Sequence, residues 1–197
     1  MNKTETPSIG PFAVDEALRA EADVLLYELG LKKLIEEYAP VHITGSYALQ
    51  LMVWRDLDIM MNAPGITVGQ FFDLGKRITV LLAPWKMFFT NSRENSSNDY
   101  PSGLYWGIRM GDIKRGAWKI DLWAFDSDQF REKVLEGEAL KSRLTEKNRL
   151  IILDLKGQLW DKPEYRDTIT SQDIYAAVLD REVKTLDEFF RFIKKKR

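Results

Sequence analysis

The sequence predicts an α+β protein, in which a mixed sheet with flanking helices is followed by a C-terminal helical bundle. Two observations carry this prediction. Five short apolar or alternating runs typical of strands lie between residues 40 and 125, and they are separated by turns or by segments with helical periodicity. After residue 125 every segment has the spacing of a helix. We therefore expect two domains, residues 1–126 and residues 127–197.

The first domain is expected to begin with one or two helices over residues 13–39, interrupted at Gly30. A strand over residues 40–44 and a brief helical stretch over residues 47–53 come next. A second strand at residues 57–61 precedes a helix at residues 68–83, where Pro84 ends the helical pattern. Three further strands are predicted at residues 85–90, 103–110 and 117–125, the last two joined by a turn with a glycine at each end.

The second domain is expected to contain four helices, at residues 128–144, 145–160, 170–180 and 185–196. The last two open with capping-box pairs, Thr170 with Asp173 and Thr185 with Glu188. These pairs satisfy backbone groups that would otherwise be unbonded at a helix start, so they mark where both helices begin.

Composition narrows the possible functions. Lys and Arg number 29 against 30 Asp and Glu, a net charge of −1, so we expect no long nucleic acid as a partner. There is no cysteine and only one histidine, which excludes disulfides, thiolate nucleophiles and multi-histidine metal sites. The sequence lacks an apolar run of membrane-spanning length and the apolar core of a signal peptide. We therefore expect a cytoplasmic protein with no membrane partner.

Two aspartates one residue apart interrupt an apolar strand. Strand alternation puts Asp56 and Asp58 on one face, opposite Leu57 and Ile59. The same alternation in residues 117–125 puts Asp121 on the polar face of its own strand. If the two strands are neighbours, three carboxylates converge, and their repulsion calls for a cation such as Mg²⁺, which prefers oxygen ligands. Two such ions could stabilise both oxygens of a phosphoryl displacement.

A Gly45-Ser46 turn lies upstream of this strand. Glycine between a strand and a helix lets the backbone approach a phosphate, while the N–H groups that follow and the serine hydroxyl can donate to it. This turn, the Asp-x-Asp strand and the later Asp121 together resemble the nucleotidyltransferase superfamily related to polymerase β, especially its small antibiotic-modifying and minimal members. The resemblance covers residues 35–126. It implies that Asp56, Asp58 and Asp121 ligate metal, that Asp121 also serves as or positions the base, and that Gly45 and Ser46 hold a nucleoside triphosphate.

Lys156 emerges from the apolar face of its predicted helix. Two interpretations remain open: its stem packs while its ammonium reaches water, or the ammonium contacts the triphosphate, as a lysine does in related enzymes. Arg109 and Lys119 are weaker candidates for a phosphate contact, because exposed cations on strands are usually solvated.

The predicted function is therefore that of an enzyme, a metal-dependent nucleotidyltransferase that moves a nucleoside monophosphate from a nucleoside triphosphate to a hydroxyl and releases pyrophosphate. The expected cofactor is Mg²⁺, with two ions. The acceptor could be a small molecule such as an aminoglycoside-like antibiotic, or a protein side chain. The alternative is a non-catalytic nucleotide-binding or interaction module on the same fold.

Overall fold

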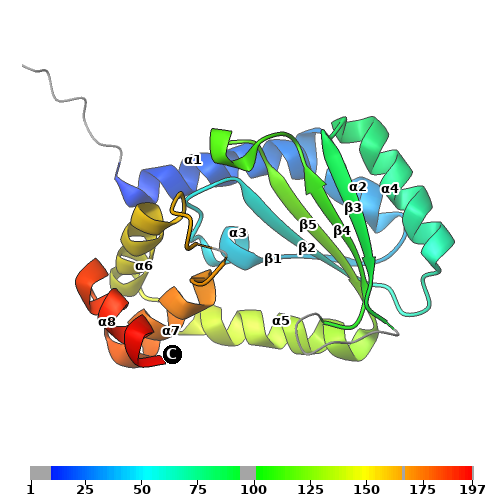
Figure 1. Ribbon diagram of the computed structural model, residues 1–197. Helices are drawn as coiled ribbons and strands as arrows, with labels where there is room; N and C mark the ends of the chain where they lie inside the picture. The colour runs from blue at the N-terminus through cyan, green and yellow to red at the C-terminus, as the bar shows by residue number, and fades with distance from the viewer. Residues whose placement is uncertain (1–9, 94–100, 166, 197) are drawn as a thin grey trace, which may run out of the picture.

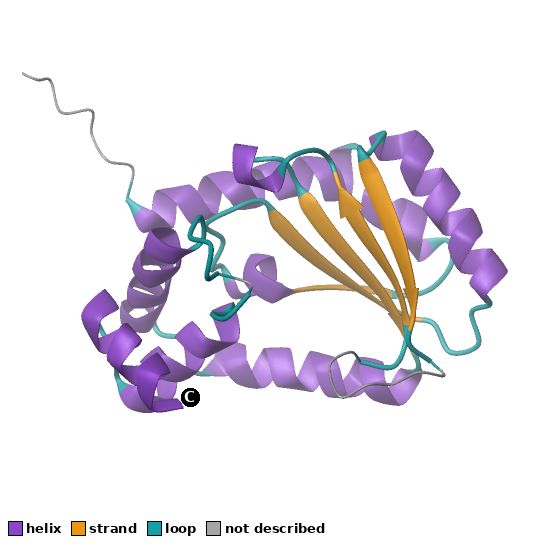
Figure 2. Ribbon diagram, viewed as in Figure 1, coloured by secondary structure: helices purple, strands orange, loops and turns teal. Residues whose placement is uncertain are grey.

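A five-stranded sheet forms the centre of the protein, as the computed structural model shows for residues 10–93, 101–165 and 167–196 (Figures 1 and 2). The strand order is β1-β2-β5-β4-β3. The strands are β1 (Val41–Thr44), β2 (Asp56–Asn62), β3 (Lys86–Asn91), β4 (Leu104–Arg109) and β5 (Lys119–Phe125). All five lie within about two residues of the predicted ranges, so the expected α+β class with a mixed sheet is confirmed.

The pairing of β2 with β5 determines the chemistry of one sheet face. These two strands are parallel, whereas β1–β2, β3–β4 and β4–β5 are antiparallel. In this register Asp58 lies opposite Asp121, and Asp56 lies opposite Lys119. The two strands are neighbours with their apolar faces aligned, as the sequence predicted, so their polar side chains share the other face.

Helices cover the apolar face of the sheet. These are α1 (Pro11–Asp23), a π-helical turn (Val24–Glu28), α2 (Leu31–Glu36) and α4 (Val68–Leu82), which enclose one continuous core with the sheet. The predicted break at Gly30 is confirmed, because Gly30 adopts a left-handed φ of 81° between the π-helical turn and α2. Residue Arg55, just before β2, donates to Glu21 of α1 from Nε at 2.6 Å and from Nη2 at 2.8 Å, which ties the start of β2 to this layer.

The polar face is partly covered by α5 (Ser127–Ser142), which runs along the sheet beside β1, β2 and the short helix α3 (Gly45–Leu49) (Figure 1). Asp126 begins α5 by accepting a hydrogen bond from the backbone N–H of Gln129 at 2.8 Å. A single 3₁₀ turn (Ile113–Arg115) connects β4 to β5. Because α5 lies over β1 and β2, the polar face forms one wall of a cleft.

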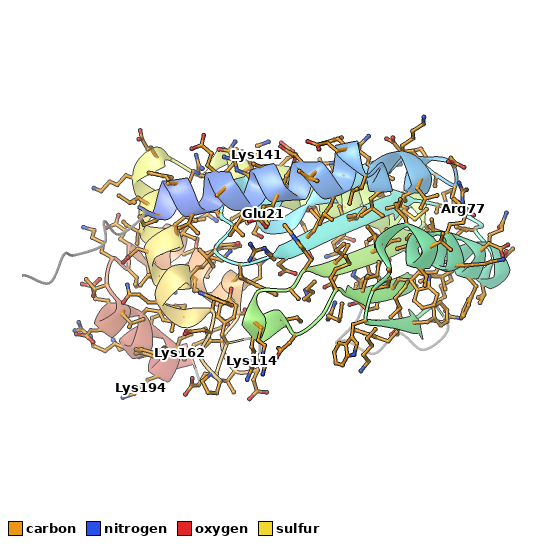
Figure 3. The ribbon with its side chains drawn as sticks, turned by 90° about the horizontal axis from the view of Figure 1, so that it is seen from above. Glu21, Arg77, Lys114, Lys141, Lys162 and Lys194 are labelled. Atoms are coloured by element: carbon orange, nitrogen blue, oxygen red, sulfur yellow. The ribbon has the colours of Figure 1, made fainter. Side chains whose placement is uncertain are left out.

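Three more helices complete the chain: α6 (Glu146–Leu159), α7 (Ser171–Arg181) and α8 (Leu186–Lys196). They form a second core that also includes Leu49 and Leu51 from the first half of the chain. A buried carboxylate contacts both halves of the chain: Asp15 on α1 accepts a hydrogen bond from the backbone N–H of Met52 at 2.8 Å, and Arg149 Nη2 on α6 lies 4.0 Å from its other oxygen. Viewed from above, Arg77 on α4 and Lys194 on α8 lie at opposite ends of the molecule (Figure 3). The division at residue 126 stays a prediction.

Candidate active site

Three carboxylates meet on the polar face of the sheet. One oxygen from each of Asp56, Asp58 and Asp121 lies within 4.8 Å of the others. The first two come from β2 and the third from β5, because the parallel register puts Asp58 beside Asp121. The predicted convergence is therefore observed, while the roles assigned to these residues stay predictions.

Gly45 lies directly against Asp58. Its φ is 66°, and a Cβ added there would lie 2.0 Å from the Asp58 Oδ2 atom. A left-handed backbone and this contact both exclude any larger residue. Gly45 and Ser46 begin α3 and follow β1, so the predicted strand-turn-helix context of the pair is present. Their contact with a triphosphate stays a prediction.

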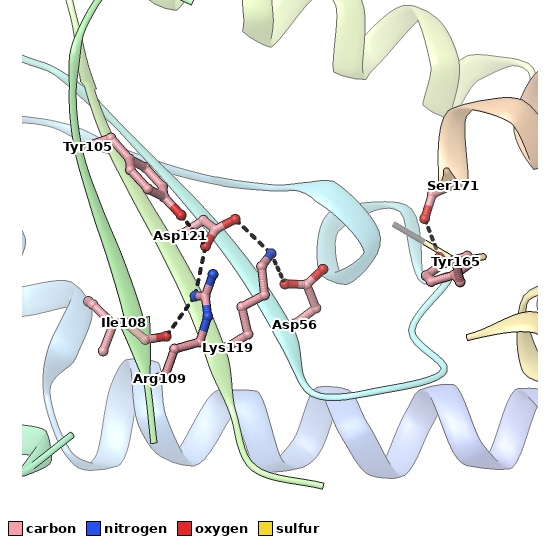
Figure 4. A network of polar contacts seen from close by, with 8 residues as sticks. All are labelled: Asp56, Tyr105, Ile108, Arg109, Lys119, Asp121, Tyr165 and Ser171. Carbon is pink, nitrogen blue, oxygen red and sulfur yellow. Dashed lines mark hydrogen bonds and ion pairs between the residues drawn. The ribbon is translucent and has the colours of Figure 1, made fainter. Parts of the chain in front are cut away.

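Cations and a phenol already hold two of the carboxylates (Figure 4). Lys119 Nζ lies 2.7 Å from Asp56 Oδ1 and 2.7 Å from Asp121 Oδ2. The other oxygen of Asp121 accepts hydrogen bonds from the Tyr105 hydroxyl at 2.8 Å and from Arg109 Nη1 at 3.2 Å. Lys119 and Arg109 were expected to be weaker candidates for a phosphate contact, since exposed cations on strands are usually solvated. They are instead paired with carboxylates, which strand phase could have indicated, because residues 119 and 121 share a face.

Burial and mutual repulsion shift the protonation of these groups. Burial, together with the charge of Asp56, raises the pKa of Asp58 to about 7. Burial also raises the pKa of Asp56, although the ammonium of Lys119 opposes this effect. For Lys119, burial favours the neutral form, but Asp56 and Asp121 outweigh burial and raise its pKa above the ordinary value. The cluster therefore gains stability from positive charge placed among its oxygens.

A cleft of about 620 Å³ opens beside this cluster. Gly45 and Asp58 line it together with residues of β1, β5 and α5, and with Gln172 of α7. Two aromatic rings of β5 contribute to the wall: Trp123 and Phe125 stack with centroids 5.3 Å apart and an interplanar angle of 11°. A flat aromatic wall next to carboxylates suits a nucleobase whose phosphates reach the carboxylates.

Lys156 lies in the interior, with 1% of its surface exposed. Its ammonium donates to the Leu51 carbonyl at 2.5 Å and to the Tyr175 hydroxyl at 3.4 Å, and burial lowers its pKa. The ammonium therefore does not reach water, so the solvated interpretation of this residue is wrong. Its contact with a triphosphate stays a prediction.

The residues present fit a hard divalent cation. Mg²⁺ prefers oxygen ligands and is commonly bound by one or two carboxylates plus substrate phosphates. Asp58 offers such an oxygen at the wall of a cleft large enough for a nucleotide, and an oxygen of Asp56 lies within 4.8 Å of it. The donor set contains no cysteine or histidine that would favour a softer metal.

No protein-family model and no curated protein sequence matches this chain. Solved structures do. Terminal uridylyl transferase 4 from Trypanosoma brucei with bound UPU matches with a TM-score of 0.51 and 12% identity, covering 95% of this chain and 72% of the other. The RNA terminal uridylyl transferase Cid1 matches with a TM-score of 0.49 and 16% identity over 86% of this chain, which spans about half (47%) of Cid1. The protein therefore has the fold of the nucleotidyltransferases related to polymerase β.

These structures correct one prediction. Near-neutral charge was taken to argue against a long nucleic acid, yet a solved protein that shares this fold is a terminal uridylyl transferase with bound UPU. The prediction of no long nucleic acid is therefore wrong, because net charge is a sum over the whole chain and says little about any local surface. Separately, in the part of the chain that the structure describes, each helix is too short or too polar to cross a bilayer. The cytoplasmic location stays a prediction.

Proposed function

We propose that this protein is a metal-dependent nucleotidyltransferase, which transfers a nucleoside monophosphate from a nucleoside triphosphate to a hydroxyl group and releases pyrophosphate. The observation that carries the proposal is the cluster of Asp56, Asp58 and Asp121 beside the glycine turn at Gly45. A solvated surface has no need to collect three carboxylates at one point, since each repels the others. The fold shared with known nucleotidyltransferases supports the same conclusion.

Each part of the site has a task in this reaction. The backbone at Gly45 and the Ser46 hydroxyl bind the phosphates, and Trp123 stacks on the base, so that the α-phosphate is held beside the carboxylates. Bound Mg²⁺ would be ligated by the aspartates and would supply stabilisation of the charge that develops on the phosphoryl oxygens. Asp121 accepts or directs the proton of the incoming hydroxyl. Tyr105 fixes the orientation of Asp121 through the hydrogen bond at 2.8 Å.

The acceptor hydroxyl that we propose to test first belongs to an RNA, because the solved structures with this fold are terminal uridylyl transferases. A small alcohol, such as an aminoglycoside-like antibiotic, and a hydroxyl side chain of a protein are the other acceptors. The cleft accommodates a nucleotide in each case, so only turnover distinguishes these classes.

The test is an assay of pyrophosphate release with Mg²⁺, each of the four triphosphates, and either a single-stranded RNA or a panel of small alcohols. Wild type should release pyrophosphate and extend or modify one acceptor. Asp58→Asn should abolish release, whereas Asp128→Asn, at an exposed position in the first turn of α5, should not change it. Equal rates for the two variants would contradict the assignment of the site.

One observation favours the alternative, a non-catalytic nucleotide-binding module. Lys119 already neutralises two of the three carboxylates, as an internal cation would in a site that has no need of metal. Such a module would bind triphosphate with the same affinity in the presence and absence of Mg²⁺, and it would release no pyrophosphate. Calorimetric titration with a non-hydrolysable triphosphate, with and without the metal, separates the two functions.

A further inference from the structure

Lys119 lies where a metal ion would compete with it. Its ammonium is 2.7 Å from an oxygen of Asp56 and 2.7 Å from an oxygen of Asp121, between two carboxylates that come from adjacent strands (Figure 4). The carboxylates of this cluster are close enough together to share a single cation. The lysine therefore uses the oxygens that a divalent ion shared by Asp56 and Asp121 would use.

The position of this ammonium is built into the fold. Lys119 is opposite Asp56 in the parallel register of β2 and β5, and its backbone N–H donates to the Arg55 carbonyl at 3.0 Å. The ammonium also lies 5.5 Å from the centre of the Trp54 ring, within reach of a cation–π interaction. Only 16% of the side chain is exposed. Leaving this position would cost two ion pairs in a largely dehydrated environment.

Asp121 has little capacity left for a metal. One of its oxygens accepts from the Tyr105 hydroxyl and from Arg109 Nη1, and the other pairs with Lys119. Two cations therefore already contact this carboxylate. A divalent ion added there would lie a few ångströms from both of them, and that repulsion is strong away from bulk water.

Asp58 differs from Asp56 and Asp121 in having no ion pair among the residues that the structure describes. Its carboxylate lines the cleft beside Gly45. Lys119 and Arg109 leave one of the three negative charges of the cluster unbalanced, and a single divalent cation more than balances it. A second divalent cation shared by Asp56 and Asp121 would lie beside Lys119 and Arg109, whose positive charges repel it.

We infer that the Lys119 ammonium takes the place of one of the two divalent ions expected for this chemistry, so that the nucleotide-loaded site binds a single divalent ion, on the Asp58 side of the cluster. This inference rests on the proposed function, and it replaces the expected pair of ions by one ion and a lysine. Lys119 is then the residue that sets the metal stoichiometry.

The experiment counts bound ions rather than turnover. Mn²⁺ is titrated into the protein with a saturating non-hydrolysable triphosphate, free Mn²⁺ is measured by its electron paramagnetic resonance signal, and the signal for nucleotide alone is subtracted. Wild type should bind one Mn²⁺ and Lys119→Met two. Without nucleotide, Lys119→Met should bind the first Mn²⁺ at least about tenfold more tightly than wild type, because its competitor is gone.

The matched control is Lys86→Met. Lys86 lies in the same row of the same sheet face, since Lys119 is opposite Arg109 and Arg109 is opposite Lys86, but it makes no ion pair with the cluster in the described structure. The Lys86→Met protein should bind one Mn²⁺, as wild type does. Removing Lys119 leaves two carboxylates without their counter-ion, so Lys119→Arg, which keeps the charge, provides an independent measurement and should also bind one. Circular dichroism melts establish that each variant is folded.

Two Mn²⁺ ions in wild type would overturn this inference and leave the proposed nucleotidyltransferase intact. A count of one in both wild type and folded Lys119→Met would also overturn it, because the lysine would then not be the competitor. No bound Mn²⁺ in wild type and in both Lys119 variants would overturn the inference and the metal dependence of the proposed function together.

Discussion

Replacing Gly45 by alanine tests whether the glycine turn positions Asp58. The new Cβ would be 2.0 Å from Asp58 Oδ2, so the carboxylate must retreat by about 1 Å to reach the shortest contact that real structures show. A displacement of about 1 Å at a reacting centre costs on the order of 100-fold in rate. Alanine at a left-handed φ of 66° adds about 1–2 kcal/mol of backbone strain.

Gly65 provides the control for the backbone strain. Its φ is 81°, and a Cβ there would have nothing within 4 Å, so Gly65→Ala introduces similar strain without touching the site. Gly65→Ala should melt about 2–8 °C below wild type, from about 1–2 kcal/mol in a chain of this length, and Gly45→Ala should melt lower still, because its Cβ also displaces Asp58. Only Gly45→Ala should lose about 100-fold in the rate of pyrophosphate release. Rates for the two variants within about fivefold of each other would refute the positioning role.

Three other predictions concern the same site. Lys156→Met should weaken binding of a non-hydrolysable triphosphate by about 1.5–3 kcal/mol, the loss of a charge-assisted hydrogen bond, and calorimetric affinities within about twofold would remove its phosphate role. Because the pKa of Asp58 rises from 3.8 to about 7 on folding, the folded state binds more protons in that window. The free energy of unfolding of the metal-free protein should therefore fall as pH rises between these two pKa values. Urea melts at a series of pH values should show that the free energy of unfolding of Asp58→Asn depends less steeply on pH. Chelation of Mg²⁺ should sharply weaken triphosphate binding, and equal affinity by calorimetry would count against a metal-dependent site.

Local patterns in the sequence predicted most of the fold. Alternation alone assigned Asp56, Asp58 and Asp121 to the polar faces of their strands, because a strand that packs on one side has a strict period of two. The capping boxes at Thr170 and Thr185 predicted two helix starts for a similarly local reason, and each helix begins at the next residue, Ser171 and Leu186.

The rest depends on contacts between distant segments. Strand phase puts Lys119 beside Asp121 on β5, but the contacts of Lys119 with Asp56 and of Arg109 with Asp121 depend on the pairing of β5 between β2 and β4. The sequence left open whether the Lys156 ammonium reaches water or contacts a triphosphate. Its burial follows from the packing of α6 against residues near Leu51. Net charge, a sum over the whole chain, carried no information on a nucleic-acid partner.

The strand order has a consequence for how the protein folds. β5 is inserted between β2 and β4, so Asp121 reaches Asp58 only after a parallel pairing across 63 residues of chain, measured from Asp56 to Lys119. Closing such a distant pair loses chain entropy before any stabilising contact forms, and parallel pairings of this kind form slowly. During synthesis the ribosome must release the chain beyond Phe125 before the third carboxylate can join the other two. The first two carboxylates and the glycine turn are therefore synthesised well before the strand that brings the third carboxylate to them.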